Sequence, residues 1–147
     1  DTAGSVYERL MHKGADLVLK TVKAIEAGNA PMVPQPQPRE NTHAPKIFKE
    51  TCQINWDQPT TSVRNFIRGL SPYPGAWTII NGKTVKVLNA RAVQRSINPE
   101  AKPGDWESDQ KTFIRLATAD GHLDIIDFQL EGKKRMTPEE FFRGNKL

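Results

Sequence analysis

Basic side chains supply the clearest chemistry in this sequence. Lys133, Lys134 and Arg135 form a run at the end of an expected strand. Ammonium and guanidinium groups bind phosphates without reading base sequence, and they release counterions from a polyanion when they do so. A solvated basic surface without a partner remains an alternative. We predict that this run and further basic residues on neighbouring elements contact RNA, namely Arg64, Arg68, Lys83, Arg91, Lys133, Lys134 and Arg135.

The alternation of side chains along a strand indicates which of these residues share a surface. Lys83 and Arg91 have the same parity as Val85 and Val87, whereas Lys86 has the opposite parity. Because successive side chains point to opposite faces, we expect Lys83 and Arg91 on one face and Lys86 on the other.

A catalytic or metal-binding constellation is not found in the sequence. His12, His43 and His122 fall on an expected helix, linker and turn, and none is spaced with Cys, Asp or Glu in a metal-ligand pattern. Asp124 and Asp127 lie three residues apart on one expected strand, which predicts opposite faces and excludes a carboxylate pair. We therefore predict no catalytic residue and no metal site in this chain.

Composition and charge are those of a globular protein that lives in water. Residues 46–147 carry sixteen basic and twelve acidic side chains, so they hold the whole net charge of +4, because residues 1–45 carry five of each. No apolar run approaches the length of a membrane span. The single cysteine, Cys52, excludes an intrachain disulfide and fits a reducing compartment, so we expect a cytoplasmic location.

The basic residues sit on elements that predict a mainly β domain. A helix over 60–70 ends at a Gly- and Pro-rich corner, and a hairpin follows around Asn81-Gly82 and continues to residue 93. Asp120-Gly121 marks a further hairpin turn, and Thr137 begins a last helix to residue 142. Three strand candidates follow the first hairpin, at 104–107, 111–117 and 123–130. Together with the two strands of the hairpin they make five, which favours a small, partly open barrel of the oligonucleotide-binding type.

Two segments precede this domain. Thr2 caps an amphipathic pattern that runs to residue 28 and is interrupted by Gly14, which predicts two short helices or one kinked helix. Such a helix needs a packing partner, which we expect outside residues 1–28. Five prolines between residues 30 and 45 predict a stiff linker. The chain opens without an initiating methionine or a secretion signal, so we expect a piece of a longer protein.

Several stretches, in order and spacing, resemble the C-terminal part of bacterial methionyl-tRNA formyltransferases. The opening residues 1–10 resemble the closing helix of the catalytic domain of that family, and the proline-rich linker and the terminal Phe141-Phe142-Arg143-Gly144 fit the same pattern. The stretches that carry the resemblance are Ile54-Asn55-Trp56, the corner from Ile67 to Trp77, and Gly132-Lys133-Lys134-Arg135-Met136.

The resemblance implies three parts. Residues 1–29 would close an upstream catalytic domain, residues 30–46 would be the linker, and residues 47–147 would be a C-terminal barrel that binds tRNA. The parent enzyme would use 10-formyltetrahydrofolate to formylate initiator methionyl-tRNA. The catalytic Asn, His and Asp of the family lie upstream of the matching helix, so this piece alone would be inactive, and it would need no membrane or metal.

Two other interpretations remain open at this point. A related formyltransferase that acts on a nucleotide sugar, or a formyltetrahydrofolate dehydrogenase, carries a similar barrel. A stand-alone RNA-binding module is the second possibility, although the helix at 1–28 fits better as the last element of a domain.

Overall fold

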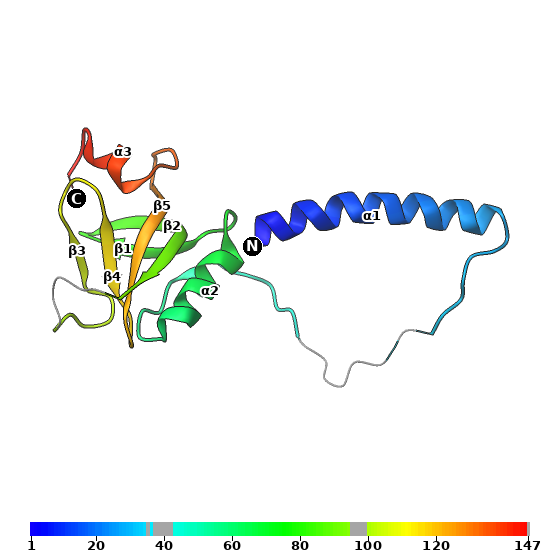
Figure 1. Ribbon diagram of the computed structural model, residues 1–147, viewed down its shortest axis with the longest axis horizontal. Helices are drawn as coiled ribbons and strands as arrows, with labels where there is room; N and C mark the ends of the chain where they lie inside the picture. The colour runs from blue at the N-terminus through cyan, green and yellow to red at the C-terminus, as the bar shows by residue number, and fades with distance from the viewer. Residues whose placement is uncertain (35, 37–42, 95–99, 147) are drawn as a thin grey trace.

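The computed structural model describes residues 1–34, 36, 43–94 and 100–146. A long N-terminal helix projects away from a sheet domain on which two further helices pack (Figure 1). The elements are α1 (Ala3–Glu26), η1 (Glu50–Cys52), α2 (Thr60–Leu70), β1 (Ala76–Ile80), β2 (Lys83–Val93), β3 (Trp106–Ser108), β4 (Ile114–Ala117), β5 (His122–Leu130) and α3 (Pro138–Phe142).

The strands form one curled antiparallel sheet in the order β1-β2-β5-β4-β3. Asn81 and Gly82 both have positive φ in the turn between β1 and β2, which is the backbone conformation that an Asn-Gly hairpin requires. The expected mainly β fold, with its five strands and flanking helices, is confirmed. Residues 95–99, between β2 and β3, lie outside the described residues.

The core lies between the concave side of the sheet and the helices. The amphipathic α2 buries Val63, Ile67 and Leu70, and most of its contacts with the sheet are to β2. At the other end α3 places Phe141 edge-on against Phe128, with 5.7 Å between the ring centroids. Such an aromatic pair contributes about 0.5–1.5 kcal/mol beyond the area it buries. The two helices therefore pack on the sheet from different ends, α2 mainly against β2 and α3 against β5.

The segment before α2 is fastened along β1. The amide of Ile54 donates to the Trp77 carbonyl at 2.8 Å, and the Trp77 indole donates to the Lys49 carbonyl at 2.8 Å. Trp56 is buried and its indole donates to the Thr78 hydroxyl at 2.9 Å. Residues 49–56 are therefore held beside the first hairpin, although they are far from it in sequence.

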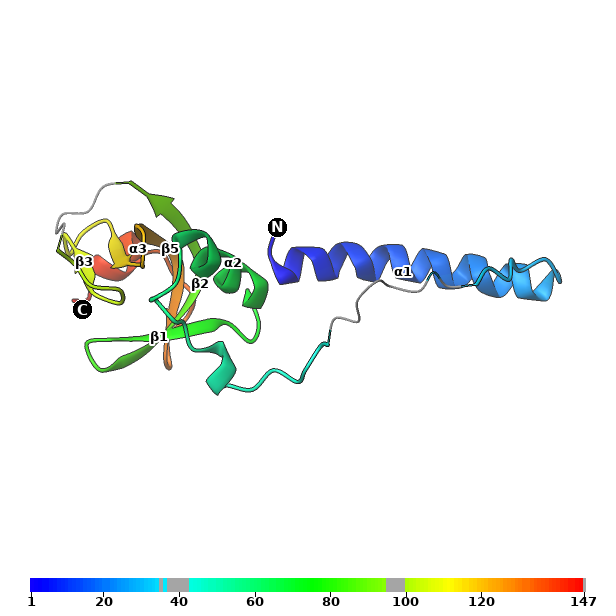
Figure 2. The ribbon, with the colours of Figure 1, turned by 90° about the horizontal axis from the view of Figure 1, so that it is seen from below.

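Helix α1 is one unbroken helix, so Gly14 interrupts neither its hydrogen bonding nor its course. The expected cap is present, since Thr2 and Ser5 form a reciprocal capping box. None of its residues is buried, and it projects from the sheet domain in both views (Figures 1 and 2). Its first turn docks on the corner after α2, where the Gly4 amide donates to the Ser71 carbonyl at 2.9 Å. No helix in the described part of the chain is long and apolar enough to cross a membrane.

Candidate nucleic-acid interface

The seven predicted contact residues do not form one surface in the structure but lie in separate regions of it. Arg64 and Arg68 come from the exposed side of α2 and line a hollow of about 320 Å³ between α2, the first turn of α1 and β2. The Arg68 guanidinium donates to the Asn65 side chain at 2.9 Å and to the carbonyl of Asp1 at 3.4 Å. This pair therefore belongs to the junction of α1 and α2 and is not part of the lysine-lined surface described below.

Arg91 and Arg135 lie on the outer face of the sheet, the face turned away from the core, and both face carboxylates. Arg91 is 3.8 Å from Asp124, and Arg135 binds Asp127 through both a hydrogen bond and an ion pair. The hydrogen bond that Arg135 donates to Asp127 raises the pKa of Arg135 above its ordinary value. An arginine that is already paired has less charge to offer a phosphate.

A third arginine, Arg115 of β4, completes an ion-pair network on this face. Its Nε donates to Asp124 at 2.6 Å, and its Nη1 lies 3.4 Å from Oε1 of Glu107. The hydrogen bond with Asp124 is the main cause that raises the pKa of Arg115. Because the side chains of Arg115, Asp124 and Glu107 are each less than a fifth exposed, this network holds β3, β4 and β5 together.

Two register shifts overturn the expected distribution of faces. Val87 pairs with Phe128, Asn89 pairs with Asp127, and Ala90 pairs with Ile125, so each strand carries one extra residue near this point. An extra residue reverses the alternation of all side chains beyond it.

The prediction that Arg91 shares a face with Lys83, Val85 and Val87 was therefore wrong. Val85, Val87 and Ala90 belong to the core, whereas Arg91 is exposed on the outer face.

The prediction that Asp124 and Asp127 lie on opposite faces of β5 was wrong for the same reason. Leu123, Ile125 and Phe128 point into the core, and both aspartates lie on the outer face. Their arginine partners, Arg91 and Arg115 for Asp124 and Arg135 for Asp127, give these carboxylates a structural role.

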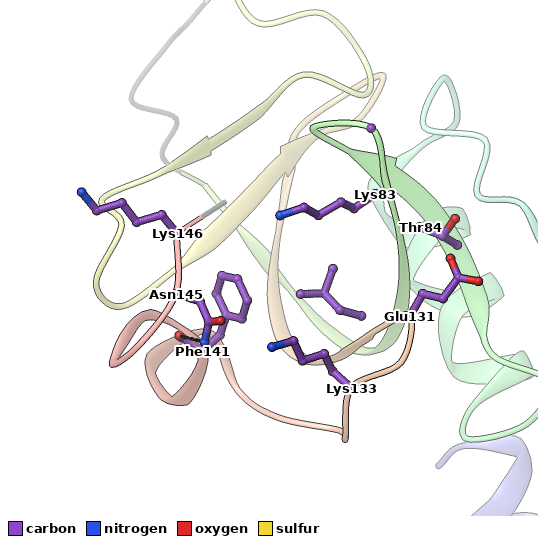
Figure 3. Close-up of a pocket in the computed structure, with 9 residues that line it drawn as sticks. Lys83, Thr84, Glu131, Lys133, Phe141, Asn145 and Lys146 are labelled. Carbon is purple, nitrogen blue, oxygen red and sulfur yellow. Dashed lines mark hydrogen bonds between the residues drawn. The ribbon is translucent and has the colours of Figure 1, made fainter.

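Lys83 and Lys133 line a hollow of about 460 Å³ at the end of the β1–β2 hairpin. Figure 3 shows their side chains pointing in the same direction, toward Phe141 and Asn145, whereas Glu131 points away from them. Lys146 also lines the hollow, and its ammonium end points outward. Of the predicted contact residues, Lys83 and Lys133 are the ones that line this hollow, and neither forms an ion pair within the described residues.

A second hollow of about 250 Å³ adjoins the first. It is lined by Lys49 and Lys86, and it shares Thr84, Leu130 and Glu131 with the first hollow. Within the described residues no ion pair involves Lys49, Lys83, Lys86, Lys133 or Lys146. We call these five residues the lysine band.

Three members of the lysine band were missed from the sequence. Lys86 was not among the predicted contact residues; as expected, it lies on the face away from Lys83, where it lines the second hollow. Lys49 reaches this place through the pairing of residues 49–54 with Trp77, for which the sequence carries no local signal. Lys146 could have been proposed, because it follows the last predicted helix by four residues. Lys134 is exposed and is not among the residues that line either hollow.

The histidines form no site in the described part of the chain, where no group of three or more His, Cys, Asp or Glu residues could hold a metal ion. His122 begins β5, instead of lying in the turn before it, and pairs with Val93 and Ala117. Its Nε2 atom is buried without a hydrogen-bond partner among the described residues. Cys52 is buried against the core.

Comparison with known proteins identifies a family. The family model "Formyl transferase, C-terminal domain" matches residues 46–146. Among curated proteins, the chain is 42% identical over 151 residues to a methionyl-tRNA formyltransferase of Phocaeicola vulgatus, covering 98% of the chain and 47% of that protein. Similar relatives with the same name occur in Bacteroides fragilis and Agathobacter rectalis, each 40% identical, covering 98% of the chain and 46% of the protein. The chain thus spans about half the length of these relatives.

Solved structures support the same fold. The structure of HypX from Aquifex aeolicus in complex with tetrahydrofolic acid matches 89% of this chain and 23% of that one, with a TM-score of 0.61 and 22% identity. A HypX variant matches with a TM-score of 0.60 and 24% identity. At this level of identity the likeness concerns the fold alone.

Proposed function

The chain belongs to the formyl transferase C-terminal domain family, and on this premise we propose that it is the C-terminal portion of a methionyl-tRNA formyltransferase. That enzyme would pass a formyl group from 10-formyltetrahydrofolate to the amino group of initiator methionyl-tRNA. The observation that carries the proposal is similarity over 98% of the chain, at about 40% identity, to proteins of that name.

The proposal assigns three parts to the chain. Residues 1–29 close the upstream catalytic domain, residues 30–46 link it to the barrel, and residues 47–147 form the tRNA-binding domain. The solvent-exposed apolar residues of α1 support the first assignment, because such a face needs a partner in the whole protein: Val6, Leu10, Leu17, Val18, Val22 and Ile25.

The chemical step belongs to the upstream domain in this proposal. Formyl transfer requires the amine, the folate and the acid–base groups to be held together, which a separate barrel cannot do. Asp124 and Asp127 do not fit as folate- or amine-binding groups, because arginine side chains already occupy both carboxylates. No step of the reaction is therefore assigned to residues of this chain, and we expect the chain alone to be inactive.

The role of this piece is to hold tRNA by its phosphates. The lysine band supports this role, since its charges have no carboxylate partner in the described structure. Lysine is a compact, mobile point charge that binds phosphate without a demand for fixed geometry. Binding of this kind is independent of base sequence and positions the RNA for a reaction that occurs elsewhere.

Titration of labelled initiator tRNA with the chain tests the proposal. We expect weak binding whose affinity falls steeply as KCl rises, and weaker binding when Lys133, Lys134 and Arg135 are all replaced by alanine. Arg135 is already paired with Asp127, so Arg135→Ala alone should cause the smallest part of the loss. Absence of binding at low salt, or binding that does not respond to salt, would refute the tRNA-holding role.

A further inference from the structure

We propose that the notch between α1 and α2 is a docking surface for the upstream domain, which therefore contacts the sheet domain directly and not only through the linker. The inference rests on the proposed function, in which α1 closes that domain. The notch has a volume of about 530 Å³, and α2 lies beside the N-terminal end of α1 in both views (Figures 1 and 2). Its two walls are formed by Val6, Tyr7 and Leu10 of α1 and by Asn65, Arg68 and Gly69 of α2.

The α1 wall of the notch is the beginning of the apolar stripe of that helix. Val6 and Leu10 lie one helical turn apart on it, and Tyr7 and Leu10 are 67% and 63% exposed. The stripe continues at helical spacing along α1 through Leu17, Val18, Val22 and Ile25. A domain that packs along this stripe therefore reaches the notch at its N-terminal end, where α2 forms the opposite wall.

The α2 wall of the notch is open and already fixed in place. Arg68 and Gly69 are exposed, and nothing lies within 4 Å of a Cβ added at Gly69. Two hydrogen bonds join α2 and the corner after it to the start of α1. The Gly4 amide donates to the Ser71 carbonyl at 2.9 Å, and the Arg68 guanidinium donates to the Asp1 carbonyl at 3.4 Å. The walls are thus preformed, which lowers the entropic cost of binding a partner.

The lining of the notch suits a protein surface better than RNA. Asp1 and Arg68 are the charged residues that line it, and they have opposite signs, so the lining carries no excess of positive charge. The Asp1 carboxylate pairs with Arg9 at 2.9 Å, and Arg68 donates to the Asn65 side chain at 2.9 Å. RNA binding depends on an excess of positive charge, whereas the centre of a protein interface is apolar and rich in Tyr and Arg. The proposal thus gives Arg68 an interdomain role.

The upstream domain fits the notch better than a second copy of the chain does. The chain covers only 47% of the Phocaeicola vulgatus relative, so more than half of such a protein lies outside the matched part. In the proposed function that part is joined covalently to residue 1, and Asp1 itself lines the notch. A tethered domain has an effective concentration of about millimolar, whereas a second copy must reach the same surface by diffusion.

Thiol labelling of introduced cysteines tests the docking surface, since the native Cys52 is buried. Gly69→Cys and Asn65→Cys each place a thiol on the α2 wall, and Val18→Cys places one on the apolar stripe away from the notch. Gly144→Cys is the matched control, because a Cβ added there also meets nothing within 4 Å and Gly144 follows α3. Each variant is made in the 147-residue chain and in the full-length protein that contains it. Labelling rates are measured without tRNA, by mass spectrometry of the peptide that carries the new cysteine.

Labelling at positions 65 and 69 should be fast in the 147-residue chain and much slower in the full-length protein. A thiol under an interdomain contact reacts only when the contact opens, so we expect the rate to fall by about 5- to 150-fold. Position 144 should be labelled equally fast in both proteins. Protection at either notch position is sufficient, so the test does not depend on the folding of one variant.

The outcomes separate the docking surface from the proposed function. If position 18 is protected in the full-length protein but positions 65 and 69 are not, α1 closes the upstream domain and the docking surface is refuted. If none of the three is protected, the assignment of α1 to the upstream domain fails as well.

Two other occupants of the notch would give different results. Protection of positions 65 and 69 that appears in the 147-residue chain and grows with its concentration would assign the notch to a second copy. Protection that appears only after tRNA is added would assign the notch to RNA. Either result would overturn the proposal.

Discussion

Replacing Gly4 by alanine tests how α1 is attached to the sheet domain. The first amides of a helix lack partners within it, and here the Gly4 amide donates to the Ser71 carbonyl at 2.9 Å. A Cβ at position 4 would lie 2.5 Å from Cδ of Pro72, whereas ordinary contact begins at 3.4 Å. The first turn of α1 must therefore move by about 0.9 Å, the difference between those distances, or the corner must yield.

The expected cost follows from these two possibilities. If the helix moves, the hydrogen bond from residue 4 to Ser71 is lost, at about 0.5–1.5 kcal/mol. If the helix stays in place, overpacking against Pro72 costs about 1–3 kcal/mol. Alanine also has a higher helix propensity than glycine, by at most about 1 kcal/mol. This gain stabilises α1 itself and does not strengthen the docking of α1 on the sheet domain. We expect Gly4→Ala to weaken docking by about 1–2 kcal/mol, a factor of roughly 5 to 30.

Gly14→Ala provides the matched control, because nothing lies within 4 Å of a Cβ added there. It should raise the helicity of α1 and leave docking unchanged. Amide hydrogen exchange at residue 4, together with the chemical shifts of Ser71 and its neighbours, measures docking in both variants. Unchanged exchange at residue 4 and unchanged Ser71 shifts in Gly4→Ala would refute the close approach of α1 to the corner.

Two further predictions concern the sheet domain. Asp124→Asn removes the charged partner that binds the largely buried Arg115 most closely, so urea unfolding should show a loss of about 1.5–3 kcal/mol. Asp127→Asn, whose partner Arg135 is 57% exposed, should lose at most about 1 kcal/mol. Equal losses would contradict the buried network. Hydrogen bonds from Thr112, and from the amides of Lys111 and Phe113, hold the pKa of Asp109 well below its usual range. The ionised Asp109 carboxylate therefore stabilises the fold above the unfolded pKa of about 3.9, and this stabilisation is lost as the pH falls through the folded pKa. Thr112→Val should raise the pKa of Asp109 in a carboxyl NMR titration, and an unchanged titration would show that the Thr112 hydroxyl is not the main cause.

Most of the fold follows from local signals in the sequence. Asn81-Gly82 predicts its hairpin because both residues accept positive φ, and the boundaries of α2 follow from its apolar spacing and the corner after it. The number of strands and the capped last helix were likewise predictable. Whether α1 was one helix or two was not, because a glycine in a helix costs only about 1 kcal/mol and the remaining pattern decides.

The candidate site was less predictable, because it depends on pairing between distant strands. A strict alternation along β2 and β5 fails where Asn89 pairs with Asp127, and a shift of one residue there moves Arg91 and Asp124 to the outer face. The sequence shows no Gly or Pro at this point that would mark the irregularity. Lys49 reaches the hairpin only because the Ile54 amide and the Lys49 carbonyl both bond to Trp77.

Pairing also decides which positive charges can act on a ligand. Arg91, Arg115 and Arg135 count as much toward net charge as the lysines do, but their carboxylate partners make them part of the sheet. The five lysines of the band have flexible side chains and no such partner in the described structure, so a phosphate can recruit them at little cost in existing contacts. These three arginines thus serve mainly structure, and the lysines of the band are the groups we expect to respond to RNA and salt.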